Sequence, residues 1–170
     1  MSLVREDLGP VHVRKARPAE AQAIADLNNQ FADEALMLRR SPETVALAID
    51  DYVVAVTPRG VVVGCGALKE YSPSLGEVAA IAVAEEAHGR GLGRQIVAAV
   101  EALALKRGTH DIFALTLQPA FFEAIGYART DRARYPEKIR RDCAGCARRA
   151  ACNEVCVAKR LDAGALQAAA

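Results

Sequence analysis

The residues best suited to chemistry lie in a glycine-rich turn that follows a strand-like stretch. Gly89, Gly91 and Gly93 occupy alternate positions within His88–Gly93. Glycines at this spacing let the bare backbone come close to a bulky group. The helix expected to follow directs its first N–H groups, and the positive end of its dipole, at whatever the turn holds. The pattern therefore predicts a binding site for a phosphate compound.

A second group with chemical potential is a cluster of cysteines near the end of the chain. Four of the five cysteines fall within fourteen residues: Cys143, Cys146, Cys152 and Cys156. Four thiolates suit tetrahedral Zn²⁺, although the middle gap is shorter than in zinc ribbons. We therefore predict a structural zinc site. The alternatives are unliganded thiols, a redox pair, an iron–sulfur cluster, or a Cys156 that faces the core from a last strand.

Apolar periodicity and turn signals give the elements that must position these residues. The expected strands are 11–16, 52–56, 61–69, 77–83, 112–117 and 155–161. The expected helices are 19–33, one that begins at Pro42 with Ser41 as its cap, 92–107 and 119–125. Gly64 and Gly66 inside a strand indicate a bulge or a close neighbour. The element order is that of a mixed α/β domain.

Length and charge limit the classes of protein. A chain of 170 residues favours a single domain, 1–170, with a core of about 11–130, a cysteine-rich segment 131–161 that completes the sheet, and a tail 162–170. A net charge of +1 gives no basic field for nucleic acid or a membrane surface. No apolar run suits a bilayer, and the N-terminus lacks the apolar region of a signal peptide. We expect a soluble, cytoplasmic protein.

The strand, the turn His88–Gly93 and the helix, placed after two helices and a hairpin, resemble the GNAT superfamily of acetyl-CoA-dependent N-acetyltransferases. The family signature is Gln or Arg, two residues, Gly, one residue, then Gly or Ala; here His88 takes the first place. The resemblance covers roughly residues 11–127. It implies the GNAT fold, an α/β (α+β) architecture with a central, mixed, mostly antiparallel sheet flanked by helices. Neither a Rossmann nor a P-loop spacing is present.

Five further segments, in order, look like the acetyltransferase domain of N-acetylglutamate synthases, which open microbial arginine biosynthesis. They are residues 37–41, 63–69, 76–79, 112–116 and 121–127. The amino-acid-kinase domain that many of those enzymes carry is absent from this sequence. The resemblance thus implies the short, single-domain kind.

The resemblance implies acetyl-CoA as the co-substrate. In the family, backbone N–H groups of the turn hold the pyrophosphate, and the preceding strand pairs with the pantetheine arm. The residues implied for this role are Ile81, Ala82, Val83, His88, Gly89, Arg90, Gly91, Leu92, Gly93 and Arg94.

The resemblance also implies two catalytic residues. An α-amino group is largely protonated at neutral pH, so acetyl transfer needs a base. Glu77 matches the glutamate that has this role in the subfamily; an ordinary exposed glutamate at a strand end is the alternative. Thr116 matches a Ser or Thr that faces the cofactor sulfur, where its hydroxyl would donate a hydrogen bond to the leaving thiolate. Phe122 occupies the place of the tyrosine that many GNAT enzymes use as an acid.

Recognition of an amino acid calls for cations that meet its carboxylates. Arg40 matches the acceptor-binding arginine of the subfamily, and Leu38 matches a position that contributes backbone contacts. Lys69 would add positive charge, or would be a solvated surface cation. An Arg and a Ser that touch glutamate in relatives are missing here, at Cys152–Glu154, so the choice of amino acid stays open.

These observations predict an enzyme that makes N-acetylglutamate from acetyl-CoA and L-glutamate by direct transfer. One alternative is a GNAT acetyltransferase for another amine, such as glutamine, a polyamine or a protein N-terminus. Another is a weakly catalytic, metal-binding sensor or interaction module. We expect a small-molecule amino acid as partner and neither nucleic acid nor membrane. A homodimer, common in the superfamily, is expected without an identified interface.

Overall fold

Seven strands form one sheet in the order β1-β2-β3-β4-β5-β7-β6 in the computed structural model, which describes residues 8–162 and 164. The strands are β1 (His12–Lys15), β2 (Tyr52–Val56), β3 (Val62–Ser72), β4 (Leu75–Val83), β5 (Asp111–Thr116), β6 (Ala128–Arg129) and β7 (Val155–Arg160). β4 and β5 pair in parallel, whereas the pairs β1–β2, β2–β3, β5–β7 and β6–β7 are antiparallel. The predicted mixed, mostly antiparallel sheet is confirmed.

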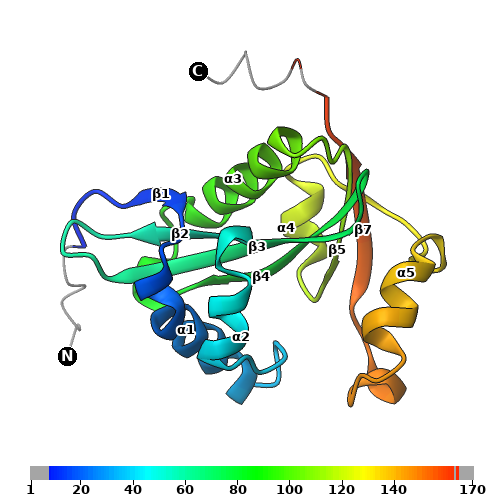
Figure 1. Ribbon diagram of the computed structural model, residues 1–170, viewed down its shortest axis with the longest axis horizontal. Coiled ribbons are helices and arrows are strands. Elements are labelled where there is room, and N and C mark those ends of the chain that lie inside the picture. Colours follow the sequence, from blue (N-terminus) through cyan, green and yellow to red (C-terminus); the bar gives the residue numbers. More distant parts are fainter. Residues whose placement is uncertain (1–7, 163, 165–170) are drawn as a thin grey trace. The chain divides into compact units, whose positions relative to one another are not determined.

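Helices connect the strands much as the sequence predicts. They are α1 (Ala21–Asp33), α2 (Pro42–Leu47), α3 (Leu92–Lys106), α4 (Pro119–Glu123) and α5 (Pro136–Lys138). Ser41 caps α2, since Thr44 N donates to its hydroxyl oxygen at 3.1 Å. Helices α1 and α2 pack against each other (Figure 1). Within residues 8–162, no helix has the length and apolar character that a bilayer crossing requires.

The chain forms two compact units. The first contains the described residues up to Leu68 together with Ala80–Leu103, and the second contains Lys69–Ala79 and the described residues from Ala104 onward. In the second unit, β7 lies along β5 (Figure 1). The single domain 1–170 stays a prediction, and most of the predicted tail lies outside the described residues.

Each unit has its own apolar core. Ile24, Val45 and Val54 are fully buried in the first unit, and Phe113 and Val157 are fully buried in the second. These side chains come from the apolar faces of the helices and strands, so burial of those faces holds each unit together.

Two segments differ from the predicted elements. β3 runs on to Ser72 and β4 begins at Leu75, so the expected strands 61–69 and 77–83 extend further toward each other than the sequence predicts. The sequence predicts no helix around Pro136, where the structure has α5 and then a π-helical turn, Ile139–Cys143. This helical segment carries no apolar stripe in the sequence, which is why periodicity did not reveal it.

Two glycines of β3 allow α3 to lie directly on the sheet. A Cβ on Gly64 would stand 2.7 Å from Ile96 Cδ1, and a Cβ on Gly66 would stand 2.6 Å from Ile96 Cγ2. The β2–β3 register also shifts between Ala55 and Val56. The expectation of a bulge or a close neighbour at these glycines is confirmed.

We expect Gly66→Ala to lower the free energy of unfolding by about 1–3 kcal/mol, because the new methyl group overpacks the contact with Ile96. Urea denaturation measures this change. Gly145→Ala is the matched control, since its Cβ would meet no atom within 4 Å. Equal urea midpoints for the two variants would contradict the prediction.

Candidate functional site

The glycine turn lies between β4 and α3 in the first unit. Gly89 and Gly91 have φ values of 78° and 72°, in the left-handed region that favours glycine. An added Cβ on either would meet no atom within 4 Å, so backbone conformation selects glycine here and the turn stays open. His88 Nε2 lies 2.8 Å from the Val83 carbonyl oxygen and so ties the end of β4 to the turn. His88 therefore shapes the turn.

The N-terminus of α3 opens onto this turn. Leu92 and Ile96 are buried and anchor the helix, while Arg90 and Arg94 are exposed. Arg90 Nη1 donates to the Gly9 carbonyl at 3.1 Å. The first N–H groups of a helix have no acceptor within it and carry its partial positive charge. This part of the chain thus fits a diphosphate group.

Two consecutive asparagines of α1 hold the chain around Arg40. The Asn29 side chain accepts from Arg40 N and donates to Arg40 O, both at 2.9 Å. Asn28 is fully buried and donates to the Leu38 carbonyl at 2.9 Å. The backbone of both predicted acceptor residues is therefore fixed, while the Leu38 side chain is 54% exposed.

The Arg40 guanidinium has a donor that no group among the described residues accepts. Its Nε is buried and has no hydrogen-bond partner in the described part of the chain. Burial raises the pKa of Cys65 to about 12, and the Arg40 charge acts against that rise. Burial also raises the pKa of Tyr52, again opposed by Arg40. Tyr52 and Cys65 are thus both neutral, so neither of them balances the positive charge of Arg40.

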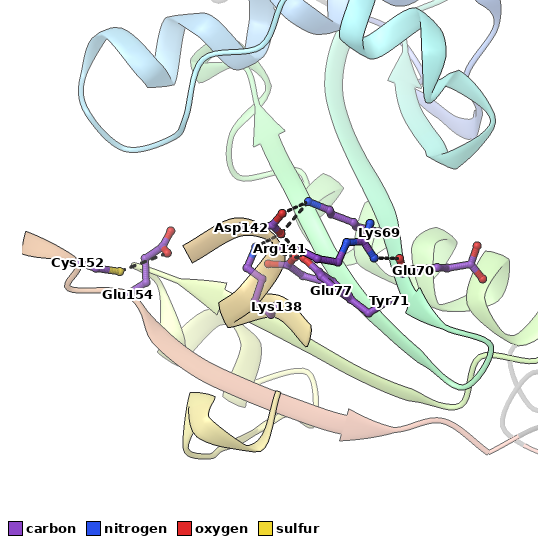
Figure 2. A network of polar contacts seen from close by, with 9 residues as sticks. All are labelled: Lys69, Glu70, Tyr71, Glu77, Lys138, Arg141, Asp142, Cys152 and Glu154. Carbon is purple, nitrogen blue, oxygen red and sulfur yellow. Dashed lines mark hydrogen bonds and ion pairs between the residues drawn. The ribbon is translucent and has the colours of Figure 1, made fainter. Parts of the chain in front are cut away.

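Glu77 is the centre of a polar network in the second unit (Figure 2). Its side chain is only 5% exposed. Its Oε2 accepts hydrogen bonds from Tyr71 Oη at 2.7 Å and from Lys138 Nζ at 2.9 Å. The alternative of an ordinary exposed glutamate is therefore excluded. Glu77 is a buried carboxylate held by one phenol and one ammonium group.

Asp142 is the second carboxylate of the network. Lys69 Nζ lies 2.7 Å from each of its oxygens, Lys138 Nζ lies 3.1 Å from Oδ2, and Tyr71 Oη lies 2.5 Å from Oδ2. Partial burial acts to raise the pKa of Asp142, but these three donors together hold that pKa well below its usual value. Lys69, predicted to bind the acceptor, is thus paired with Asp142.

Tyr71 joins the two carboxylates. Burial, followed by the charges of Glu77 and Asp142, raises the pKa of Tyr71 far above its ordinary value, so the phenol keeps its proton. The ring centroids of Tyr71 and Phe113 are 5.7 Å apart, and Arg141 Cζ lies 4.9 Å from the centroid of the Tyr71 ring. The ring is therefore fixed by packing while its hydroxyl faces both carboxylates.

Sequence reasoning missed three members of the network: Tyr71, Lys138 and Asp142. Lys138 and Asp142 point from the helical segment toward Glu77 and Tyr71 on the strands (Figure 2). π-helical turns such as Ile139–Cys143 are rare and frequently occur at functional sites. The available signal was a Lys and an Asp four residues apart, Lys138 and Asp142, the first of them two residues after Pro136.

Thr116 stands at the end of β5 and is nearly buried. Gln118 N donates to its Oγ1 at 2.9 Å. The hydroxyl hydrogen of Thr116 is therefore left to donate elsewhere. Phe122 packs edge-on against Tyr127, with ring centroids 5.1 Å apart, and supplies no donor.

The predicted zinc site is not supported. In the ranges that the structure describes, no three His, Cys, Asp or Glu side chains group together so as to hold a metal. Cys156 lies in β7, and burial raises the pKa of its thiol to about 11, which opposes the thiolate that zinc needs. Cys152 Sγ instead accepts from Arg132 Nη1 at 3.4 Å. Of the alternatives, a Cys156 that faces the core from the last strand is confirmed, because Cys156 is buried in β7.

We expect Asp142→Asn to destabilise the protein more at neutral than at acid pH. The pKa of Asp142 is lower when folded than the ~3.9 of an unfolded chain, so its contribution is present above that value and lost as pH falls through the folded pKa. Urea denaturation at several pH values should show the difference from wild type narrowing below about pH 4.

Asp33→Asn is the control for this pH series, because Asp33 forms an exposed ion pair with Arg39. Exposed pairs contribute little, so this variant should stay close to wild type at every pH. A difference between Asp142→Asn and wild type that does not vary with pH would contradict the expectation.

Comparison with known proteins gives a consistent result. The model of the acetyltransferase (GNAT) family matches residues 14–130. An uncharacterized N-acetyltransferase of Chlorobaculum tepidum is 40% identical over 149 residues, which are 88% of this chain and 96% of the relative. An amino-acid acetyltransferase of Mycobacterium tuberculosis is 33% identical over 127 residues, 74% of this chain and 72% of the relative.

A solved structure extends the comparison to three dimensions. The structure of N-acetylglutamate synthase from Neisseria gonorrhoeae, complexed with coenzyme A and N-acetyl-glutamate, is similar with a TM-score of 0.80 and 26% identity. The match covers 91% of this chain but 36% of that longer protein.

Proposed function

Because the chain belongs to the acetyltransferase (GNAT) family, we propose that it transfers the acetyl group of acetyl-CoA to the α-amino group of L-glutamate. The observation that carries this proposal is the buried Glu77 carboxylate on β4, the strand that leads to the glycine turn. The names of two similar proteins, an amino-acid acetyltransferase and an N-acetylglutamate synthase, support an amino acid as acceptor. The product would enter arginine biosynthesis.

Acetyl-CoA would bind through backbone groups. The open turn at Gly89 and Gly91 and the N-terminus of α3 fit its pyrophosphate. In the proposal, the backbone of Ile81–Val83 pairs with the pantetheine arm. Neither role depends on particular side chains, which agrees with a histidine at position 88.

Glu77 would act as the general base. It takes a proton from the substrate ammonium group, and the nitrogen lone pair then attacks the thioester carbonyl carbon. The carbon–sulfur bond breaks as the tetrahedral intermediate collapses, a second proton leaves the nitrogen, and the coenzyme A thiolate that departs takes up this proton to become the free thiol. Thr116, whose hydroxyl hydrogen is left to donate, would hydrogen-bond to this sulfur.

Arg40 would bind a carboxylate of the acceptor. Its buried Nε has no partner in the described part of the chain, and a buried donor without an acceptor is costly. A carboxylate would satisfy it with a charge-assisted hydrogen bond. Lys69 would contribute less, because Asp142 already neutralises it. The expected homodimer and cytoplasmic location stay predictions.

Glutamine is the second candidate acceptor. Relatives place an arginine for glutamate just before the last strand, where this chain has Cys152–Glu154. Arg132 reaches this place, but it donates to the Glu154 carbonyl at 2.6 Å and to Cys152 Sγ. Because Arg132 already binds the backbone here, it is not available to bind a second substrate carboxylate. This favours an acceptor with one carboxylate, such as glutamine, over glutamate.

A screen of free amino acids with acetyl-CoA, followed by release of the coenzyme A thiol, tests the function. We expect turnover with glutamate above that with other amino acids. Faster turnover with glutamine would replace the first candidate by the second. No thiol release with glutamate at saturating concentration would overturn the glutamate proposal.

We expect Glu77→Gln to lower kcat about 10²–10⁴-fold, because the amide cannot accept the proton. Binding of coenzyme A, measured by calorimetry, should be unchanged. Glu123→Gln is the matched control, since Glu123 forms an exposed pair with Arg129. Turnover by Glu77→Gln at the wild-type rate would rule out the proposed base.

We expect Arg40→Lys to raise KM for glutamate roughly tenfold, because lysine keeps the charge but loses the guanidinium donor Nε. Steady-state kinetics with varied glutamate measure the change, and KM for acetyl-CoA should stay constant. Arg39→Lys, at the exposed neighbouring arginine, is the control. Equal KM values for both variants would count against Arg40.

A further inference from the structure

The proposed reaction releases one proton per turnover, and that proton must leave the protein. A substrate ammonium group carries three protons on nitrogen, and the product amide keeps one. A second proton ends on the sulfur of coenzyme A. The third is the proton that Glu77 takes, and Glu77 must lose it before the next turnover. The route by which this proton leaves rests on the proposed role of Glu77 as the base.

Burial prevents Glu77 from passing this proton readily to bulk water. Its side chain is 5% exposed, whereas the side chain of Asp142 is 24% exposed. A group that connects these two carboxylates would provide a way to solvent.

The charged and titratable neighbours of Glu77 leave few carriers. Lys138 is positively charged and has no lone pair to accept a proton. Burial is the largest single influence on Lys138 and acts to lower its pKa, but the charges and hydrogen bonds of Glu77 and Asp142 together outweigh it and raise that pKa, so the ammonium persists. Cys156, on β7, makes no hydrogen bond to Glu77 in the described part of the chain, so it offers no direct path for the proton. Among the described residues, the hydrogen-bond partners of Glu77 are Lys138 and Tyr71, and of these two the neutral Tyr71 hydroxyl can both accept and donate a proton.

We propose that Tyr71 relays the proton from Glu77 to Asp142, from which it passes to solvent. Tyr71 Oη lies 2.7 Å from Glu77 Oε2 and 2.5 Å from Asp142 Oδ2 (Figure 2). Both distances are hydrogen-bond distances, so the three groups form a continuous path.

Each transfer along this path is balanced. The O–H bond of protonated Glu77 breaks as a new O–H bond forms on Tyr71. The original Tyr71 O–H bond breaks as its hydrogen bonds to Asp142 Oδ2. Tyr71 ends with one proton, as it began, and Asp142 gives its proton to water. Because the pKa of Asp142 is depressed, the transfer onto Asp142 is uphill and its release of the proton to water is downhill, so protonated Asp142 is a short-lived carrier.

The same hydroxyl partners Glu77 in both of its states. Before the reaction its single hydrogen lies between the two ionised carboxylates and can be donated to either of them. After Glu77 has taken a proton, the hydroxyl accepts from it and turns its own hydrogen to Asp142. Lys69 and Lys138, which both bind Asp142, keep that carboxylate in place.

Tyr71→Phe tests the relay, because it removes the hydroxyl and keeps the ring that packs on Phe113. We expect kcat to fall about tenfold or more, KM for acetyl-CoA to stay constant, and the solvent deuterium isotope effect on kcat to increase. Added imidazole, a diffusible proton carrier, should restore part of the lost rate in a concentration-dependent way. A merely structural role for Tyr71 would not respond to imidazole.

Tyr135→Phe is the matched control. Tyr135 stacks on the same Phe113 ring, with the two ring centroids 4.1 Å apart. We expect it to keep the wild-type kcat and to show no rescue by imidazole. A wild-type kcat in Tyr71→Phe overturns the relay, and so does a loss of rate that imidazole leaves unchanged.

Failure of the relay and failure of the proposed function give different results. Lack of glutamate turnover by the unmodified protein counts against the acceptor. The relay is judged by the ratio of kcat between Tyr71→Phe and wild type, on whichever amine the wild-type protein acetylates. Equal rates on that amine reject the relay, whatever the acceptor.

Discussion

A buried carboxylate has to be compensated, and Glu77 imposes this requirement on its surroundings. An ionised group taken out of water without a partner costs several kcal/mol. Tyr71 and Lys138 meet the charge of Glu77, Asp142 meets the charge of Lys138, and Lys69 meets the charge of Asp142. One buried charge thereby determines residues on β3, β4 and the helical segment after Pro136. The cysteine-containing segment thus belongs to the candidate active site through its charged residues.

The two units use different chemistry. The first offers backbone groups: two glycines with positive φ and the N-terminus of a helix that Gly64 and Gly66 allow to lie on the sheet. The second offers ionisable side chains whose pKa values are shifted by burial and by one another, namely Tyr71, Lys138 and Asp142. A backbone site tolerates a change such as histidine at position 88, whereas the network around Glu77 depends on each partner.

The sequence predicted those features that local patterns encode. Glycine spacing, the Ser41 cap and the alternation of apolar residues indicated the turn, the helix start and most strands, and the mixed sheet is confirmed. The partners of Glu77 were not predictable in this way, because Lys138 lies 61 residues from it along the chain. The cysteine spacing misled for a related reason, since spacing does not show that Cys156 is buried in a core.

The helical turn that carries Lys138 and Asp142 has a consequence for evolution by insertion and deletion. Each residue added to or removed from a helical segment rotates the rest of that segment about its axis. A change of length between Lys138 and Asp142 would therefore turn one charge away from Glu77 while leaving the other in place. Homologous chains should keep a constant length there.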